Sequence, residues 1–100
     1  MVYVDDAEVS KYGRGWFHLT ADTLEELHAF AARIGVPIRA FHRGARHPHY
    51  DITGLQRLNA LRSGACSVTA RDVVRVARQI ARSREAGVVE IQDPQLALFA

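Results

Sequence analysis

The residues best suited to chemistry lie in one short stretch, from Arg46 to Asp51. It combines a cation, two imidazoles, a phenol and a carboxylate, with Pro48 in the middle. Burying any one of these polar groups without a partner would cost roughly 1–3 kcal/mol. The stretch follows an apolar run and precedes a helical pattern that begins near Thr53. We therefore expect a strand-to-helix loop, where α/β proteins often carry functional residues, with a plain solvated turn as the alternative.

Carboxylates and imidazoles elsewhere in the chain suggest a metal site. Asp5 and Asp6 follow an apolar segment, and together with His49 and Asp51 they would offer oxygen and nitrogen ligands to Mn²⁺, Mg²⁺ or Zn²⁺. His18 is a further candidate, as a ligand or as a general base. The alternative for an aspartate pair after a strand is a turn or a helix cap.

Hydrolysis of a phosphodiester would need such a metal together with cations that neutralise the phosphate. We assign that catalytic role to Arg46 and Arg71, beside His18 and His49. His28 lies next to the apolar stripe of the first predicted helix. It is expected to be a hydrogen-bonded residue at the edge of the core.

The elements that must position these residues follow from apolar spacing and turn residues. The spacing predicts helices that begin after Thr23, Thr53 and Thr69, with glycines ending the first two and Gly87 ending the third. Short apolar runs predict strands at residues 2–4, 36–41 and 65–68, and an additional edge strand at residues 88–91. Residues 16–19 are expected to form either a further short strand or a packed loop. Alternating strands and helices predict a small α/β domain of two or three layers, with a mainly parallel sheet and about three helices.

A parallel sheet would gather the candidate residues at one edge. The carboxyl ends of parallel strands open on the same side, so residues that follow different strands meet there. We therefore expect Asp5, His18, His49 and Asp51 to share one pocket. The domain would cover residues 1–86, and residues 87–100 would form an edge strand or a linker that carries a docking peptide.

Composition limits the function classes. The chain has 100 residues, a formal net charge of +2 and one cysteine, so it makes one domain without a disulfide framework. It contains no apolar run of the ~20 residues that cross a bilayer and no pattern of a secretory signal, which predicts a cytoplasmic protein without a membrane partner. Twelve of its thirteen basic residues are arginines, which suit phosphate contacts.

Four of these arginines recur at intervals of four, three and four along the third predicted helix: Arg71, Arg75, Arg78 and Arg82. We expect this stripe to have no acidic partner on its face, which is typical of a surface that follows a phosphate backbone. An ordinary solvated helix face is the alternative. Arg14, Arg39, Arg43 and Arg46 would form a second basic patch near the predicted site.

The last residues resemble a docking peptide. Gln95, Leu96, Leu98 and Phe99 fit the pattern Gln-Leu-x-Leu-Phe, by which bacterial DNA-processing proteins bind the replication sliding clamp. Leu98 and Phe99 would fill an apolar cleft on the clamp, and the Gln95 amide would hydrogen-bond at its rim. The alternative is a terminal segment that folds back on its own core.

Most of the chain, roughly residues 2–75, resembles the DUF4031 family of unknown function. The resembling segments are Tyr3 to Asp6, Trp16 with His18 and Leu19, Ala21 to Ala31, His49 to Asp51, and Gly64 to Arg71. The resemblance implies that Asp5, His18, His28 and the triplet His49-Tyr50-Asp51 belong to the family pattern. The clamp-like tail lies outside it.

Together these patterns predict a DNA-processing protein that associates with a sliding clamp and carries a metal-dependent nuclease site. A non-catalytic clamp-binding adaptor or inhibitor with a nucleotide-binding rim is the first alternative. A small-molecule enzyme unrelated to DNA is the second.

Overall fold

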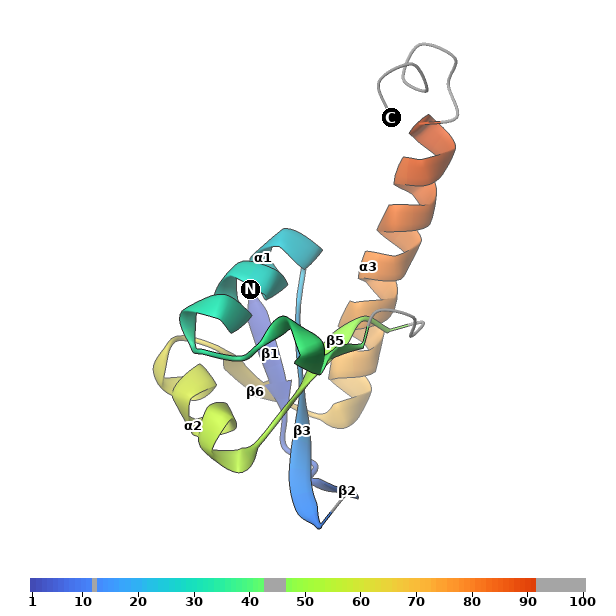
Figure 1. The fold of residues 1–100 in the computed structure, drawn as a ribbon. Coiled ribbons are helices and arrows are strands. Elements are labelled where there is room, and N and C mark those ends of the chain that lie inside the picture. Colours follow the sequence, from blue (N-terminus) through green and yellow to red (C-terminus); the bar gives the residue numbers. More distant parts are fainter. Residues whose placement is uncertain (12, 43–46, 92–100) are drawn as a thin grey trace.

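The computed structural model describes residues 1–11, 13–42 and 47–91, with side chains up to Arg82. This part of the chain forms an α/β domain with three α-helices, as predicted (Figure 1). The helices are α1 (Leu24–Arg33), α2 (Gly54–Arg62) and α3 (Ala70–Ile91). The strands are β1 (Val2–Asp5), β2 (Val9–Lys11), β3 (Arg14–Ala21), β4 (Phe41–His42), β5 (His49–Ile52) and β6 (Cys66–Val68).

The six strands form a mixed sheet, so the prediction of a mainly parallel sheet was wrong. The strand order is β4-β5-β3-β1-β6, with β2 paired to β3. Among the described pairs only β1 and β6 are parallel, and the other four pairs are antiparallel. A parallel connection needs a dozen or more residues, usually a helix. The segment between β1 and β3 is too short for that, and it forms the hairpin of β2 and β3 instead.

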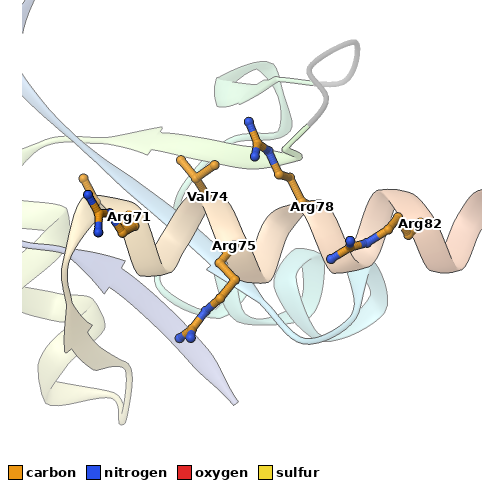
Figure 2. A pocket seen from close by; sticks show the side chains of 6 residues that line it. Arg71, Val74, Arg75, Arg78 and Arg82 are labelled. Atoms are coloured by element: carbon orange, nitrogen blue, oxygen red, sulfur yellow. The ribbon is translucent and has the colours of Figure 1, made fainter.

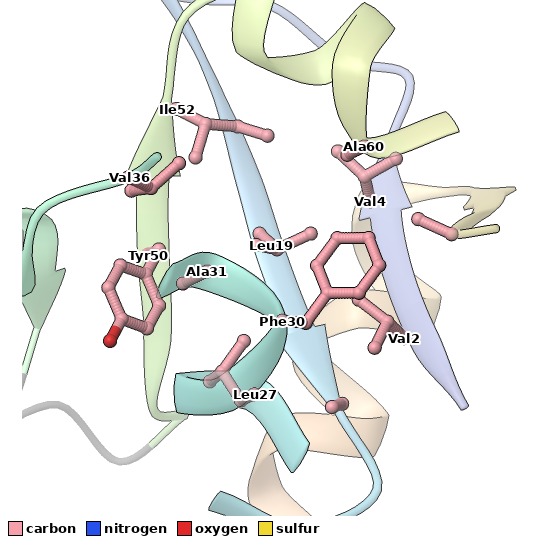
Figure 3. Packing of buried hydrophobic residues seen from close by; sticks show 12 residues of the cluster. Val2, Val4, Leu19, Leu27, Phe30, Ala31, Val36, Tyr50, Ile52 and Ala60 are labelled. Carbon is pink, nitrogen blue, oxygen red and sulfur yellow. The ribbon is translucent and has the colours of Figure 1, made fainter. Parts of the chain in front are cut away.

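Helices cover both faces of the sheet, which gives three layers. Apolar residues on one face, among them Val4, Leu19 and Ile52, pack with Leu27 of α1 and Ala60 of α2 in one buried cluster (Figure 3). Helix α3 contacts β1 and β3 and belongs to the other face. Among the side chains of α3 up to Arg82, those of Val73, Val76, Ala77 and Ile80 are buried.

The predicted helix starts are confirmed by their caps. Backbone amides in the first turns of α1 and α2 donate to the hydroxyls of Thr23 and Thr53. At α3 the Asp72 amide donates to the Thr69 hydroxyl, and the Asp72 carboxylate accepts from Thr69. Gly35 has a φ of 80°, a conformation that favours glycine and ends α1 as predicted.

Two predicted segments between α1 and α2 have a different structure. Residues 36–41 were expected to form one strand, but Ile38–Ala40 make a 3₁₀ turn (η1) in which the Ala40 amide donates to the Pro37 carbonyl at 3.0 Å. Pro37 has no N–H for a sheet ladder, which explains the interruption. The stretch expected as a strand-to-helix loop lies partly in β5, because His49–Ile52 pair with β3 and β4.

The strand predicted for residues 88–91 is also wrong. These residues belong to α3, which continues through Gly87 to Ile91 and runs past the sheet (Figure 1). A single glycine costs a helix about 1 kcal/mol relative to alanine, which weakens a helix without necessarily ending it. In the described part of the chain no helix is both long and apolar enough to cross a membrane.

Candidate metal centre

Polar side chains form a row across the middle of the sheet, on the face that α3 partly covers. His18 of β3 lies directly opposite Asp51 of β5. Asp5 ends the neighbouring strand β1, one residue after Val4, which lies opposite Leu19. His49 precedes Asp51 by two positions, so both point to the same face. The antiparallel register therefore brings together four residues that are distant in sequence.

Three of these residues, His18, His49 and Asp51, form a group that could hold a metal ion, and we call them the metal group. Donor atoms of His18, His49 and Asp51 all lie within 4.8 Å of one another. The Asp51 Oδ1 atom is 3.8 Å from His18 Nε2 and 3.3 Å from His49 Nε2. Ligands that bind one tetrahedral ion at about 2.0–2.1 Å lie roughly 3.4 Å apart, so a small closure of the group would complete the site.

The His49 ring is held so that Nε2 offers a lone pair to this site. Its Nδ1 lies 2.7 Å from the His47 carbonyl oxygen, which only accepts, so Nδ1 carries the hydrogen. Burial lowers the pKa of His49, since a charged imidazole is poorly solvated there. The neutral ring thus presents an unprotonated Nε2 to the Asp51 carboxylate, another acceptor. Two facing acceptors at 3.3 Å are favourable only with a proton or a cation between them.

The His18 ring is oriented by Asp5 in the same way. Its Nδ1 lies 2.7 Å from Asp5 Oδ2, and its backbone amide donates to Asp5 Oδ1 at 3.0 Å. The hydrogen bond to Asp5 raises the pKa of His18, with help from the charges of Asp5 and Asp51. A metal at Nε2 would therefore displace a proton. The Asp5 carboxylate, fully buried, has the place of the outer partner in a carboxylate–histidine–metal arrangement.

Asp51 is fixed through its second oxygen, by a residue that the sequence analysis missed. His42 Nε2 lies 2.6 Å from Asp51 Oδ2. The His42 ring also stacks on His49 at 4.8 Å between centroids, and His47 stacks on His49 at 5.3 Å. His42 could have been found only from its pairing with His49 across β4 and β5, and the sequence did not reveal that register.

The other predicted site residues have different places. Asp6 is exposed and lies outside the group of three, and Arg46 lies outside the described residues. His28 is at the edge of the core, as predicted, with Nδ1 2.6 Å from the Tyr50 hydroxyl. Arg71 is exposed at the start of α3, and no contact with the metal group is found for it among the described residues. Of the candidate ligands, the group of three contains His18, His49 and Asp51, and it leaves out Asp5 and Asp6.

The arginine stripe lies along the outer side of α3 (Figure 2). A shallow groove of about 450 Å³ runs over Arg71, Val74, Arg75, Arg78 and Arg82. Contrary to the prediction, the stripe has an acidic partner, because Arg75 pairs with Asp72 at 3.1 Å. Arg78 points away from Arg75, and its charge contributes, after burial, to the lowered pKa of His47. Arg78 is thus the stripe residue whose charge acts on His47.

A second cleft, of about 580 Å³, opens beside Asp51 and His42. Its lining includes the cations Lys11, Arg14 and Arg39 and the ring of Trp16. Lys11 Nζ lies 4.0 Å from Asp51 Oδ2, so the cleft and the metal group adjoin. Two arginines of the predicted second basic patch therefore lie beside the metal group.

Comparison with known proteins identifies the family. No curated protein and no solved structure matches the chain. The family described as "Protein of unknown function (DUF4031)" matches residues 2–80, a span that includes every residue of the metal group and its hydrogen-bonding partners. The chain therefore belongs to the DUF4031 family.

Proposed function

We propose that this protein is a metal-dependent phosphodiesterase that acts on DNA, with His18, His49 and Asp51 as the metal ligands. The observation that carries the proposal is the meeting of two imidazole nitrogens and one carboxylate oxygen within 4.8 Å. Each of the three side chains is also held by a separate partner: Asp5, the His47 carbonyl and His42. Such outer partners are typical of functional metal sites.

The donor set favours some metals over others. Two imidazoles and one carboxylate suit Zn²⁺, Mn²⁺ or Fe²⁺, whereas Mg²⁺ prefers oxygen ligands. Three protein ligands leave coordination positions open for water and substrate, as in catalytic sites. Mn²⁺ and Zn²⁺ are therefore the first ions to test.

The positive charge around the site supports a phosphate substrate. Lys11, Arg14 and Arg39 line the adjoining cleft, and the α3 stripe adds four guanidinium groups. A divalent ion in the site would polarise a phosphate oxygen and lower the pKa of water. In the reaction, water adds to phosphorus, the bond from phosphorus to the leaving oxygen breaks, and that oxygen takes up a proton.

The test measures metal binding and cleavage separately. Calorimetry with Mn²⁺ and Zn²⁺ should give one site per chain in the wild type and no detectable site in Asp51→Asn. Cleavage of single-stranded, double-stranded or branched DNA should require the metal and disappear in the same variant. Arg62→Gln, a change at the far end of α2, is the matched surface control. Absence of metal binding in the wild type would reduce the cluster to a hydrogen-bonded network and contradict the proposal.

The C-terminal sequence favours association with a sliding clamp, either to deliver the nuclease to DNA or as a non-catalytic adaptor or inhibitor. Gln95, Leu96, Leu98 and Phe99 lie outside the described residues, so the docking peptide stays a prediction from sequence. Paired apolar anchors that cost about 2 kcal/mol or more each would weaken binding roughly a thousandfold when both become alanine. Calorimetry of purified clamp with the intact chain and with Leu98→Ala/Phe99→Ala tests this. Equal binding by both, or none by either, would contradict it.

A further inference from the structure

The cleft beside Asp51 is lined by cations and an aromatic ring, which have no role in binding a metal ion. Among the described residues that line it are three cations, Lys11, Arg14 and Arg39, and one carboxylate, Asp51, which belongs to the metal group. Lys11, Arg14 and Arg39 come from two separate parts of the chain, the β2–β3 hairpin and the turn before β4. Their convergence leaves an excess of positive charge at the site's entrance, which attracts an anion.

Trp16 adds an aromatic surface to the same cleft. It lies two residues before His18 on β3, so both side chains point to one face of the sheet, about 7 Å apart along the strand. The Trp16 Nε1 donates to the Lys11 carbonyl at 2.9 Å, which fixes the ring position. The ring is half-buried and lines the cleft, so it is available for stacking.

The cleft and the adjoining metal group together offer cations for a phosphate, an aromatic ring for a base and a metal site for the bond to be cleaved. These are the groups that one nucleotide of a strand would need. We propose that this cleft binds one unpaired nucleotide of the substrate, with its phosphate on Arg14 and Arg39 and its base on Trp16. The volume of about 580 Å³ lies within the usual range of roughly 300–1,000 Å³ for small-ligand pockets. Stacking on a side chain requires a base that is free of its partner strand. The substrate is therefore a single strand or a frayed end.

This inference deepens the proposed function and names its substrate class. It separates the roles of the two basic regions. The cleft takes one nucleotide next to the metal, while the α3 stripe contacts the phosphates of a longer strand.

The experiment uses the emission of Trp16, the single tryptophan of the chain. The full-length protein is titrated in chelator, so that no metal-dependent cleavage occurs. The probes are deoxyadenosine 5′-monophosphate, deoxyadenosine, inorganic phosphate, a short single-stranded oligodeoxyadenylate and its duplex. We expect the mononucleotide and the single strand to quench Trp16, and the nucleoside and the phosphate to do so only at much higher concentration.

Variants locate the binding. Arg14→Gln and Arg39→Gln should each raise the dissociation constant of the mononucleotide about tenfold, and Arg62→Gln should leave it unchanged. Trp16→Phe keeps a stacking surface, so calorimetry should show it binding more tightly than Trp16→Ala. Equal quenching by deoxyadenosine and its monophosphate, unchanged binding in both arginine variants, or tighter binding of the duplex would overturn the inference.

The outcome separates this inference from the proposed function. If the protein bound the nucleotide in chelator but bound neither Mn²⁺ nor Zn²⁺, the nucleotide cleft would be supported and the nuclease proposal would be contradicted. If Arg14→Gln and Arg39→Gln showed metal-dependent cleavage with an unchanged KM, the nuclease proposal would be supported and nucleotide binding in the cleft would be contradicted.

Discussion

The metal group and the arginine stripe are both dense in charge, but their side chains are held very differently. His18, His49 and Asp51 each have a second partner that fixes the orientation of the donor atom. In the stripe the described ion pair is that of Arg75 with Asp72, and the four arginines are exposed. Fixed donors in a partly buried place suit a small ion with strict geometry, because the protein has already ordered them. Exposed guanidinium groups suit a polyanion that tolerates many positions.

The largest expected effect is that variants of the metal group lose only metal binding, whereas variants of the arginine stripe lose only DNA binding. His18→Ala/His49→Ala should abolish Mn²⁺ and Zn²⁺ binding and leave DNA binding in chelator nearly intact. A variant with glutamine at Arg71, Arg75, Arg78 and Arg82 should do the reverse. Calorimetry for the metals and anisotropy of a labelled oligonucleotide measure the two properties. If either variant lost both, the regions would form one site and the comparison would fail.

A smaller effect tests whether the outer partners of the metal group matter. Asp5→Asn keeps the shape of the side chain but removes the charge that supports His18. Loss of such a partner typically weakens metal affinity 10–100-fold, and we expect a change of that order. Thermal unfolding of the metal-free protein serves as the control for folding. An unchanged affinity would contradict a supporting role of the Asp5 carboxylate.

Two single changes in the stripe should differ in their salt dependence. For single-stranded DNA, each phosphate neutralised contributes about 0.7 to the slope of log K against log salt concentration. Arg78→Gln should lower the slope by about that amount. Arg75→Gln should lower it less, because Arg75 is already paired with Asp72. Equal slopes for both variants would mean that the ion pair does not restrain Arg75.

The smallest effect concerns the acidic residue of the stripe. Hydrogen bonds from Thr69 hold the pKa of Asp72 below its ordinary value of 3.8, with the charges of Arg75 and Arg71 adding to this. Stability from the ionised carboxylate is therefore fully present above pH 3.8 and is lost as the pH falls through the lowered value. Asp72→Asn should flatten the pH dependence of the unfolding free energy in that window. Denaturant unfolding of both proteins between pH 2 and 5 measures it.

Features that depend on near neighbours in the chain could be predicted from the amino-acid sequence. Thr23, Thr53 and Thr69 start helices because each hydroxyl accepts from an amide three residues later. The chemical character of His49 and Asp51 was also evident, as was the arginine stripe, which needs only the helical repeat. Asp5 and Asp51 lie on strands that run in the same direction, because β1 and β5 both pair antiparallel with β3.

Pairing between distant strands determines which residues complete the site. His18 was already a candidate ligand, but it lies beside Asp51 because β3 inserts antiparallel between β1 and β5, a register that depends on pairing between distant segments. His42 becomes a partner of Asp51 through the pairing of β4 with β5, and Asp6 leaves the group because it lies beyond the end of β1. Strand register follows from the packing of whole faces, since a shift of one residue turns every side chain to the other side. No local pattern carries that information.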